Sequence, residues 1–229
     1  MDQSLTRRSL IGVGLAMPLL GLAACVGGPL GLDHAAAIRR LLSLSSQRAF
    51  ARLLVENGFF ETEVARVTLP PELGGNGPTS LLAALLRTEA VQRRLLQQVN
   101  RAAETAADAA APIVLQSIRS LRFTDAVAIV RGGSSAATDY LQRSMGRAIF
   151  DAMLPGVGSG LRLFDSAILQ EALRAATGID FAELQHDVTL KASEGIYRAI
   201  AREEAAIRDD PAATGDPLLE AAFGLLGSA

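Results

Sequence analysis

The chain has few residues of the types that usually recognise nucleic acids. It has no tryptophan, aromatic residues make up 4% of its 229 residues, and 22 basic residues nearly balance 24 acidic ones. A nearly neutral chain has no electrostatic footprint for a nucleic acid, and few rings are available to stack on bases. We therefore expect no nucleic-acid partner.

Metal-ligating and nucleophilic residues are also scarce. Histidine occurs only as His34 and His186, and cysteine only as Cys25. Zinc sites usually need three or four ligands at fixed spacing, and the HExxH, CxxC, GxSxG and SxxK patterns are all missing. We predict no metal, no cofactor and no catalytic residue. Because a Ser/His/Asp triad is assembled in space, an enzyme stays open as the less favoured class.

Lysine occurs once, as Lys191. A single lysine could be catalytic, but Asp187 lies four residues earlier, which is the favourable order for an ion pair on a helix surface. Asn100, Arg101 and Glu104 lie on a predicted long helix and complete, with Lys191, a candidate polar cluster. Such residues could line a pocket, although a structural hydrogen-bond network is the commoner explanation.

Residues 1–24 have the pattern of an export signal peptide. Arg7 and Arg8 precede an apolar run, and small residues lie just before Cys25. The run from Leu10 to Ala24 has 15 residues, fewer than the roughly 20 that cross a membrane, so a permanent transmembrane anchor is the weaker alternative. The Arg7-Arg8 pair resembles a twin-arginine export motif, and the general secretory route also stays open.

Leu22-Ala23-Ala24-Cys25 resembles the lipobox of bacterial lipoproteins, in which the cysteine is lipidated. Two or three acyl chains, at about 0.8 kcal/mol per CH₂, hold a protein on a membrane. Residues 25–32 would then form a lipidated tether. Val26 in place of aspartate favours, by resemblance to known sorting rules, the periplasmic face of the outer membrane.

Apolar residues recurring every three to four positions predict one all-α domain over residues 33–229. Asp33 should cap a first helix whose apolar stripe contains Ile38, Leu41, Leu42, Ser45, Ala49 and Leu53. No sustained two-residue alternation appears, although a short strand over 64–69 stays open. We predict a compact bundle of about eight helices, with the signal segment outside the fold.

Prolines, glycines and alanines predict where the inner helices end and how they pack. Pro112 should begin a new helix, and Thr124 should cap the next one. The alanine-rich part of the helix before Pro112 should pack its backbone close to another helix. Residues 154–160 contain a proline and three glycines, which predicts a flexible break that could act as a hinge.

The GGSS sequence at 132–135 lies between two predicted helices. One glycine should take the left-handed conformation, and one serine should cap the following helix. Free N–H groups at a helix start also favour an anion. A phosphate loop needs the longer GxxxxGK[ST] pattern after a strand, however, and here no lysine follows. We predict a plain turn and leave open whether it is more.

Charged residues after Asp180 predict a solvated helix face. Glu204 and Arg208 lie four residues apart, as in a surface ion pair. Glu203 and Glu204 could supply an acid and a base, but adjacent helical positions point in different directions, so a charged face is the better interpretation. The predicted core residues of this helix are Leu190, Ile196, Ile200 and Ile207.

Five segments together resemble a known family: VTLPPEL (67–73), NRAAE (100–104), PIVLQSIRSL (112–121), FTDAVAIVRGGSSAATDYL (123–141) and VTLKASEGIYRAIAREEAAIRDDPAA (188–213). They resemble the bacterial family named domain of unknown function 4197, over most of residues 35–226. The di-glycine run is the most specific part. The resemblance implies an exported helical protein and supplies no catalytic residue. Ser134 and Ser135 stand where the family often has acidic residues, which argues against a cation at this turn.

These observations favour an exported, lipid-anchored envelope protein that binds a protein partner or supports assembly through its helix faces. A carrier of an apolar ligand such as a lipid is the alternative, because leucine, isoleucine and valine are abundant and a hinge is possible. An enzyme is the third. The sequence gives neither the partner nor the oligomeric state.

Overall fold

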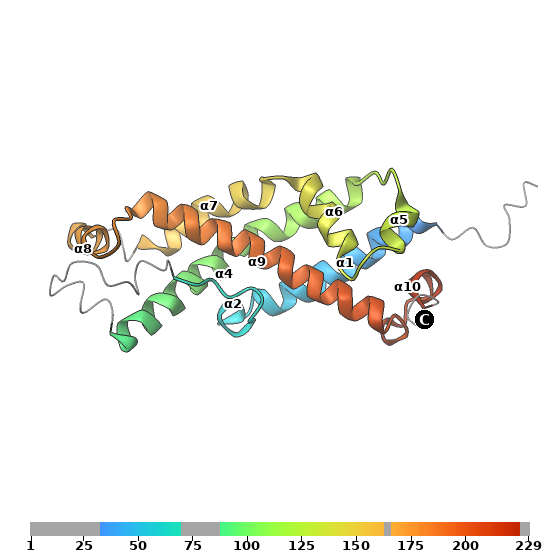
Figure 1. Cartoon of the computed structure of the whole chain (residues 1–229), viewed down its shortest axis with the longest axis horizontal. Helices are drawn as coiled ribbons and strands as arrows, with labels where there is room; N and C mark the ends of the chain where they lie inside the picture. Colours follow the sequence, from blue (N-terminus) through green and yellow to red (C-terminus); the bar gives the residue numbers. More distant parts are fainter. Residues whose placement is uncertain (1–32, 70–87, 163–165, 225–229) are drawn as a thin grey trace, which may run out of the picture. The chain divides into compact units, whose positions relative to one another are not determined.

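Every regular element in the described part of the chain is helical (Figure 1). The computed structural model describes residues 33–69, 88–162 and 166–224. These ranges contain nine α-helices and one 3₁₀ helix: α1 (His34–Leu53), α2 (Gly58–Glu61), α4 (Glu89–Ser120), α5 (Ala126–Val130), α6 (Ala136–Met145), α7 (Ala148–Gly160), α8 (Ala167–Thr177), α9 (Phe181–Asp209), η3 (Ala212–Thr214) and α10 (Pro217–Phe223). The all-α prediction is confirmed, and residues 64–69 do not form a strand.

Aspartates cap four of the described helices, α1, α5, α9 and α10, and this was predicted for α1. The Asp33 carboxylate accepts the Ala36 N–H at 2.9 Å. Asp180 accepts the Glu183 N–H at 2.9 Å, and Glu183 accepts the Asp180 N–H in return at 3.0 Å. Asp216 caps α10 in the same way. Each carboxylate satisfies N–H groups that have no partner inside the helix.

The helix α4 is continuous, so the predicted break at Pro112 is wrong. It runs for 32 residues from Glu89 to Ser120 with Pro112 inside it. A proline inside a helix removes one backbone hydrogen bond and costs about 3 kcal/mol. Here Ala110 and Val114, on either side of Pro112, are fully buried. Core packing therefore outweighs the local preference of the proline.

The alanine-rich part of α4 packs closely against α7, as predicted. A Cβ atom on Gly156 would lie 2.9 Å from the Cα of Ala106, and one on Gly160 would lie 2.7 Å from the Cα of Ala102. The two backbones therefore approach more closely than side chains would permit. The predicted hinge over 154–160 is wrong, because these residues belong to α7.

The core forms where α9 packs against α1 and α7 (Figure 1). The predicted stripe of α1 is buried along its whole length: Ile38, Leu41, Leu42, Ser45, Ala49 and Leu53. On α9, Ile196, Ile200 and Ile207 are fully buried as predicted. Leu190 is 42% exposed, so its prediction as a core residue is wrong.

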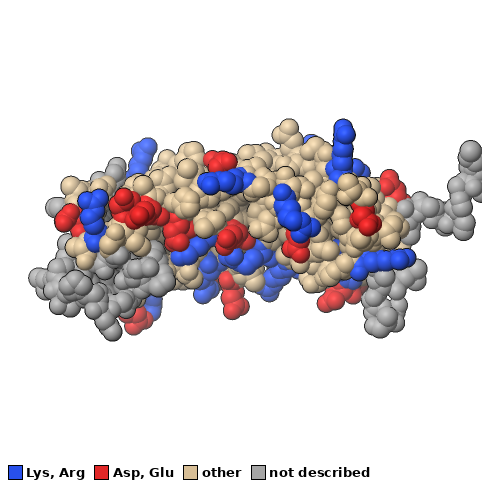
Figure 2. All heavy atoms as spheres, turned by 45° about the horizontal axis from the view of Figure 1, so that its top comes forward, with Lys and Arg blue, Asp and Glu red and all other residues tan. Residues whose placement is uncertain are grey.

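Charges of both signs occur on the surface. On the face drawn in Figure 2, basic and acidic side chains are interspersed among other residues. Among the helices of the described ranges, none is both long and apolar enough to cross a membrane.

Candidate functional site

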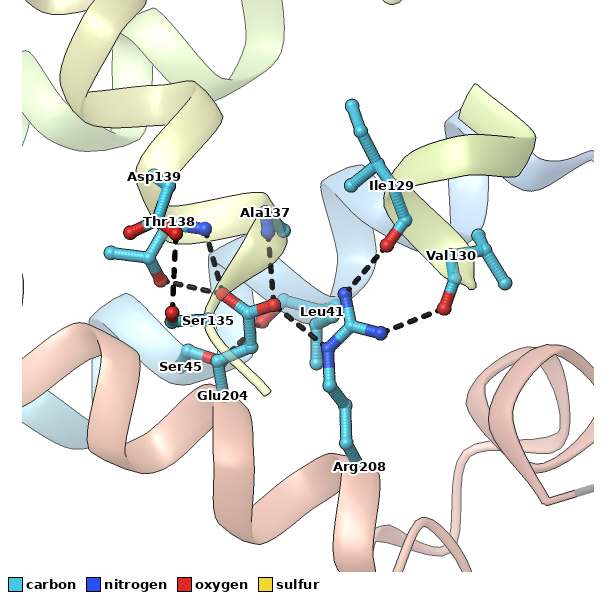
Figure 3. A network of polar contacts seen from close by, with 10 residues as sticks. All are labelled: Leu41, Ser45, Ile129, Val130, Ser135, Ala137, Thr138, Asp139, Glu204 and Arg208. Carbon is cyan, nitrogen blue, oxygen red and sulfur yellow. Dashed lines mark hydrogen bonds and ion pairs between the residues drawn. The ribbon is translucent and has the colours of Figure 1, made fainter. Parts of the chain in front are cut away.

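A buried carboxylate on α9 holds the start of α6 (Figure 3). Glu204 is fully buried. Its carboxylate accepts the N–H of Ala137 at 3.0 Å, the N–H of Thr138 at 2.7 Å and the hydroxyl of Thr138 at 2.6 Å. These N–H groups belong to the first turn of α6, where they have no partner within the helix. Glu204 therefore caps α6 from a different helix.

Arg208 holds the end of α5 in a corresponding way. Its Nε donates to Glu204 at 2.8 Å, and its two terminal nitrogens donate to the carbonyls of Val130 at 2.9 Å and Ile129 at 3.1 Å. Helix-terminal carbonyls lack partners of their own and favour a cation. The guanidinium also lies 4.8 Å from the ring centre of Phe223 on α10. One ion pair thus joins α5, α6, α9 and α10.

The predicted surface ion pair and charged face are both wrong. The side chains of Glu204 and Arg208 are 0% and 10% exposed. Glu203 is also buried, and it pairs with Arg52 of α1 at 2.9 Å. A signal for this burial was present in the sequence, because Ile200 and Ile207 lie four positions before and three positions after Glu204. Such spacing places all three residues on one face of the helix.

The GGSS turn differs from its predicted geometry. Within the described ranges the glycines with positive φ are Gly146, Gly178 and Gly215, so neither glycine of this turn is left-handed. Gly132 is instead required by space, since a Cβ there would lie 2.6 Å from the Cβ of Ala136. Ser135 does not cap α6, and its hydroxyl lies 3.2 Å from the Asp139 carboxylate. The anion at this helix start is Glu204 itself.

The approach to α5 is also anchored by side chains. Asp125, rather than the predicted Thr124, caps α5 by accepting the Ala128 N–H at 2.9 Å. The Tyr140 hydroxyl of α6 donates to the Arg122 carbonyl at 2.5 Å. The Tyr140 ring lies 5.3 Å from that of Phe123. These contacts fix the segment between α4 and α5 on α6.

An open hollow of about 320 Å³ lies between α5 and α6. It is lined by Thr124, Asp125, Ala128, Ile129, Ala136, Asp139, Tyr140 and Arg143. Val127 on α5 is 40% exposed. Val127 does not line the hollow. We call the hollow, together with the exposed side of α5 that contains Val127, the α5–α6 surface. The Glu204–Arg208 pair holds both helices that form it.

Two members of the predicted polar cluster bind the same segment of backbone. Asn100 accepts the Val67 N–H at 2.8 Å and donates to the Val67 carbonyl at 2.9 Å. Lys191 donates to the Thr68 carbonyl at 3.2 Å and pairs with Asp187 at 2.7 Å. Asn100 on α4 and Lys191 on α9 therefore attach residues 67–68 to the bundle.

The other members of the predicted set lie elsewhere. Glu104 accepts the Phe59 N–H of α2 at 3.3 Å, and burial raises the pKa of its carboxyl. Arg101 is exposed on α4. The predicted lipidation residue Cys25 and the predicted export residues Arg7 and Arg8 lie outside the described residues.

His186 lies at a second hollow, of about 190 Å³, between the α6–α7 junction and α9. We call it the junction hollow. It also contains Glu194 and Tyr197, whereas Lys191 is not part of its lining. His34, the other histidine, is the first residue of α1. Within the described ranges, no group of three or more His, Cys, Asp or Glu residues is placed to hold a metal ion.

The structure is an all-α domain. Its most extensive network of polar contacts, around the Glu204–Arg208 pair, is buried in the bundle and holds two short helices. The chain belongs to the family described as protein of unknown function (DUF4197), whose profile matches residues 31–224. Comparison with curated proteins and with solved structures finds no match. The predicted family is therefore confirmed, and its description assigns no activity.

Proposed function

We propose that the chain is a lipid-anchored protein of the bacterial envelope that binds a protein partner through its α5–α6 surface, without catalysis. The observation that carries the proposal is the buried Glu204–Arg208 pair. Burying two charges is expensive, and such a pair often contributes little net stability compared with apolar residues. A buried ion pair at this turn is explained if fixing the positions of α5 and α6 is more important for function than raising the stability of the domain.

The two helices held by the Glu204–Arg208 pair are too short to be stable as helices on their own. The helix α5 has five residues and α6 has ten, and isolated helices shorter than about 12 residues are marginal in water. A surface that is fixed before binding loses less conformational entropy when a partner docks. The clamp therefore supports a role for the α5–α6 surface in recognition.

The anchor part of the proposal rests on the sequence before Asp33. Cys25 follows a basic pair, an apolar run and small residues, which is the pattern of a signal that ends in a lipidated cysteine. Acylation of this cysteine would hold the domain at the membrane surface.

A lipid carrier is less well supported than a surface binder. Three hollows lined by described residues have volumes of about 190, 160 and 320 Å³. Pockets for drug-sized ligands start at about 300 Å³. All three hollows are open to solvent and include charged side chains, such as Arg52 and Glu203 in the smallest. They suit surface contacts better than the enclosure of an acyl chain.

The surface is tested by photo-crosslinking in cells. A photo-crosslinking amino acid replaces Val127 on the α5–α6 surface or, as the control, Val55, which is 56% exposed in the segment after α1. We expect one defined protein adduct from Val127 that is absent from Val55. Glu204→Gln should weaken this adduct, and Glu194→Gln, in a solvent-exposed ion pair, should not. Equal adducts from both positions, or none from Val127, would contradict the proposal.

The anchor is tested separately by Cys25→Ser. We expect the native chain to carry acyl mass at residue 25 and to partition with membranes, and the variant to lose both properties. Intact-mass measurement and membrane fractionation give the two readouts. A native chain without acyl mass would remove the anchor and leave the binding surface unaffected.

A further inference from the structure

A third hollow lies between the C-terminal half of α1, residues 61–64 and α9. We call it the α1–α9 hollow. It has a volume of about 160 Å³ and is lined by Ala49, Arg52, Glu61, Thr62, Val64, Ala199, Arg202 and Glu203. Ala49 of α1 and Ala199 of α9 are both buried. Their small side chains leave space that larger side chains would fill.

Glu203 brings a buried carboxylate to this hollow. Its side chain is 6% exposed, whereas that of its ion-pair partner Arg52, 2.9 Å away, is 61% exposed. This ion pair is the only polar contact between the Glu203 carboxylate and a described residue. The neighbouring Glu204 carboxylate, in contrast, has four donors. Since a carboxylate has about four acceptor positions, Glu203 retains capacity for further donors.

The carboxylate oxygens of Glu203 are accessible from solvent. Within the described ranges, the side-chain nitrogen and oxygen atoms that are closed off from solvent and lack a hydrogen-bond partner belong to His34, Ser46 and Tyr197. Glu203 is not among them, although no described residue donates a hydrogen bond to it. A ligand in the α1–α9 hollow can therefore donate to this carboxylate. A charge-assisted hydrogen bond in such a largely buried place is stronger than one in water.

The lining of the α1–α9 hollow has two charges of each sign. Besides Glu203 and Arg52 it contains Glu61 and Arg202, and neither of these two forms an ion pair with another residue that the structure describes. A ligand with a single charge would meet repulsion as well as attraction here. A zwitterion matches both signs, because an ammonium group suits a carboxylate and the fork of a guanidinium suits a carboxylate of the ligand.

The size of the hollow admits only a small zwitterion. Its volume of about 160 Å³ is below the roughly 300 Å³ of drug-sized pockets. The apolar part of the lining consists of Ala49, Val64 and Ala199. These side chains give room for a short apolar group beside the two charged ones.

We propose that the α1–α9 hollow binds a small α-amino acid in its zwitterionic form. The ammonium group donates to Glu203, the carboxylate accepts from Arg202, and the short side chain contacts the alanines of the lining. The proposal concerns a different part of the molecule from the α5–α6 surface and does not depend on the membrane anchor.

The test uses L-alanine as the probe and the full chain in a non-ionic detergent. Saturation-transfer NMR detects binding through the methyl signal of the amino acid. We expect transfer to this signal and a Kd on the order of 1 mM, as for other ligands of this size. Propionate lacks the ammonium group and ethylamine lacks the carboxylate. Each should bind at least about tenfold more weakly than L-alanine, because each loses the hydrogen bonds of one charged group.

Arg202→Gln should weaken binding of L-alanine about tenfold, the effect of one lost hydrogen bond to a charged group. The variant should still fold, because Arg202 is exposed and has no ion pair to lose. Arg94→Gln is the matched control, since Arg94 is exposed on α4 and is not in the lining. It should leave the Kd unchanged. Glu203→Gln should abolish binding, and circular dichroism checks that this variant folds.

Three results would each overturn the proposal. The first is the absence of saturation transfer at about ten times the expected Kd. The second is binding of propionate or ethylamine as tight as that of L-alanine, which would exclude recognition of a zwitterion. The third is the same Kd for Arg202→Gln and Arg94→Gln, which would exclude the Arg202 guanidinium.

Discussion

At the scale of single residues, Glu204 has the most crowded polar environment of the clamp. One carboxylate accepts two backbone N–H groups, one hydroxyl and one guanidinium. An acceptor with four donors cannot be replaced by an amide without turning a donor toward a donor. Position 204 therefore requires a negatively charged side chain, and a neutral side chain of the same shape does not suffice.

We therefore predict that Glu204→Gln lowers the free energy of unfolding by about 3 kcal/mol, the usual cost of removing one partner of a buried ion pair. Urea denaturation followed by circular dichroism measures this change. The matched control is Glu194→Gln, in a pair whose two side chains are each 48% exposed. Its expected effect is below about 0.5 kcal/mol. Similar losses for both variants would show that the buried pair is not special.

Two other carboxylates make stability depend on pH with opposite signs. The hydrogen bond from Arg40 lowers the pKa of Asp216, and burial raises the pKa of Glu104. A lowered pKa contributes stability above the unfolded value of about 4, and this is lost as pH falls through the folded pKa. A raised pKa means that the ionised group weakens the fold at neutral pH, and that protonation at lower pH removes the cost.

We predict that Asp216→Asn destabilises the chain at pH 7 and that its difference from the native chain shrinks at pH 3. Asparagine is also a good N-cap, so the variant isolates the charge. Glu104→Gln should stabilise the chain at pH 7, and its difference should also shrink at pH 3. Urea denaturation at the two pH values measures both. If each variant differs from the native chain by the same free energy of unfolding at both pH values, these carboxyls do not set the pH dependence of stability.

At the scale of helices, an aspartate cap is a local signal, whereas the continuity of a helix is not. Asp33, Asp180 and Asp216 act through N–H groups two or three residues away, so a short sequence window contains the whole interaction. Whether Pro112 and the glycines of α7 interrupt a helix depends on the residues that pack against them. Their local preference for a break is overridden by contacts between α4 and α7, which lie far apart in the sequence.

The candidate site was predicted less well for the same reason. The GGSS turn was recognised as a turn, but Glu204, which holds the helix start after it, lies 67 and 66 positions from Ala137 and Thr138 in the sequence. The spacing of four residues between Glu204 and Arg208 is compatible with an ion pair on the surface and with a buried one. The junction hollow was missed because a gap between helices exists only after folding.

The sign of the stability change caused by one substitution in α7 distinguishes a hinge from a closely packed helix. In an exposed helix interior, glycine to alanine stabilises by about 1 kcal/mol. At Gly156 the new Cβ would meet the backbone of Ala106 at 2.9 Å. We predict that Gly156→Ala destabilises the chain by about 1–3 kcal/mol, as overpacking does. Ser159→Ala, at an exposed position of the same helix, should be neutral or stabilising. Stabilisation by both variants would contradict close packing.

At the scale of the whole molecule, the proposed anchor limits where the domain can act. Residues 26–32 are the seven residues between Cys25 and Asp33. Fully extended, they span about 25 Å at roughly 3.5 Å each. A partner of the α5–α6 surface would therefore lie on, or close to, the membrane that holds the acyl chains.

A longer tether tests this limit. Repeating the VGGPLGL sequence once would extend the reach to about 50 Å without changing Asp33 or the helix that it caps. We predict no gain in the photo-crosslinked adduct at Val127, because a longer tether lowers the effective concentration of a partner on the same membrane. The unfolding free energy should be unchanged, which serves as the control. An adduct that forms only with the longer tether would place the partner farther away than the native chain can reach.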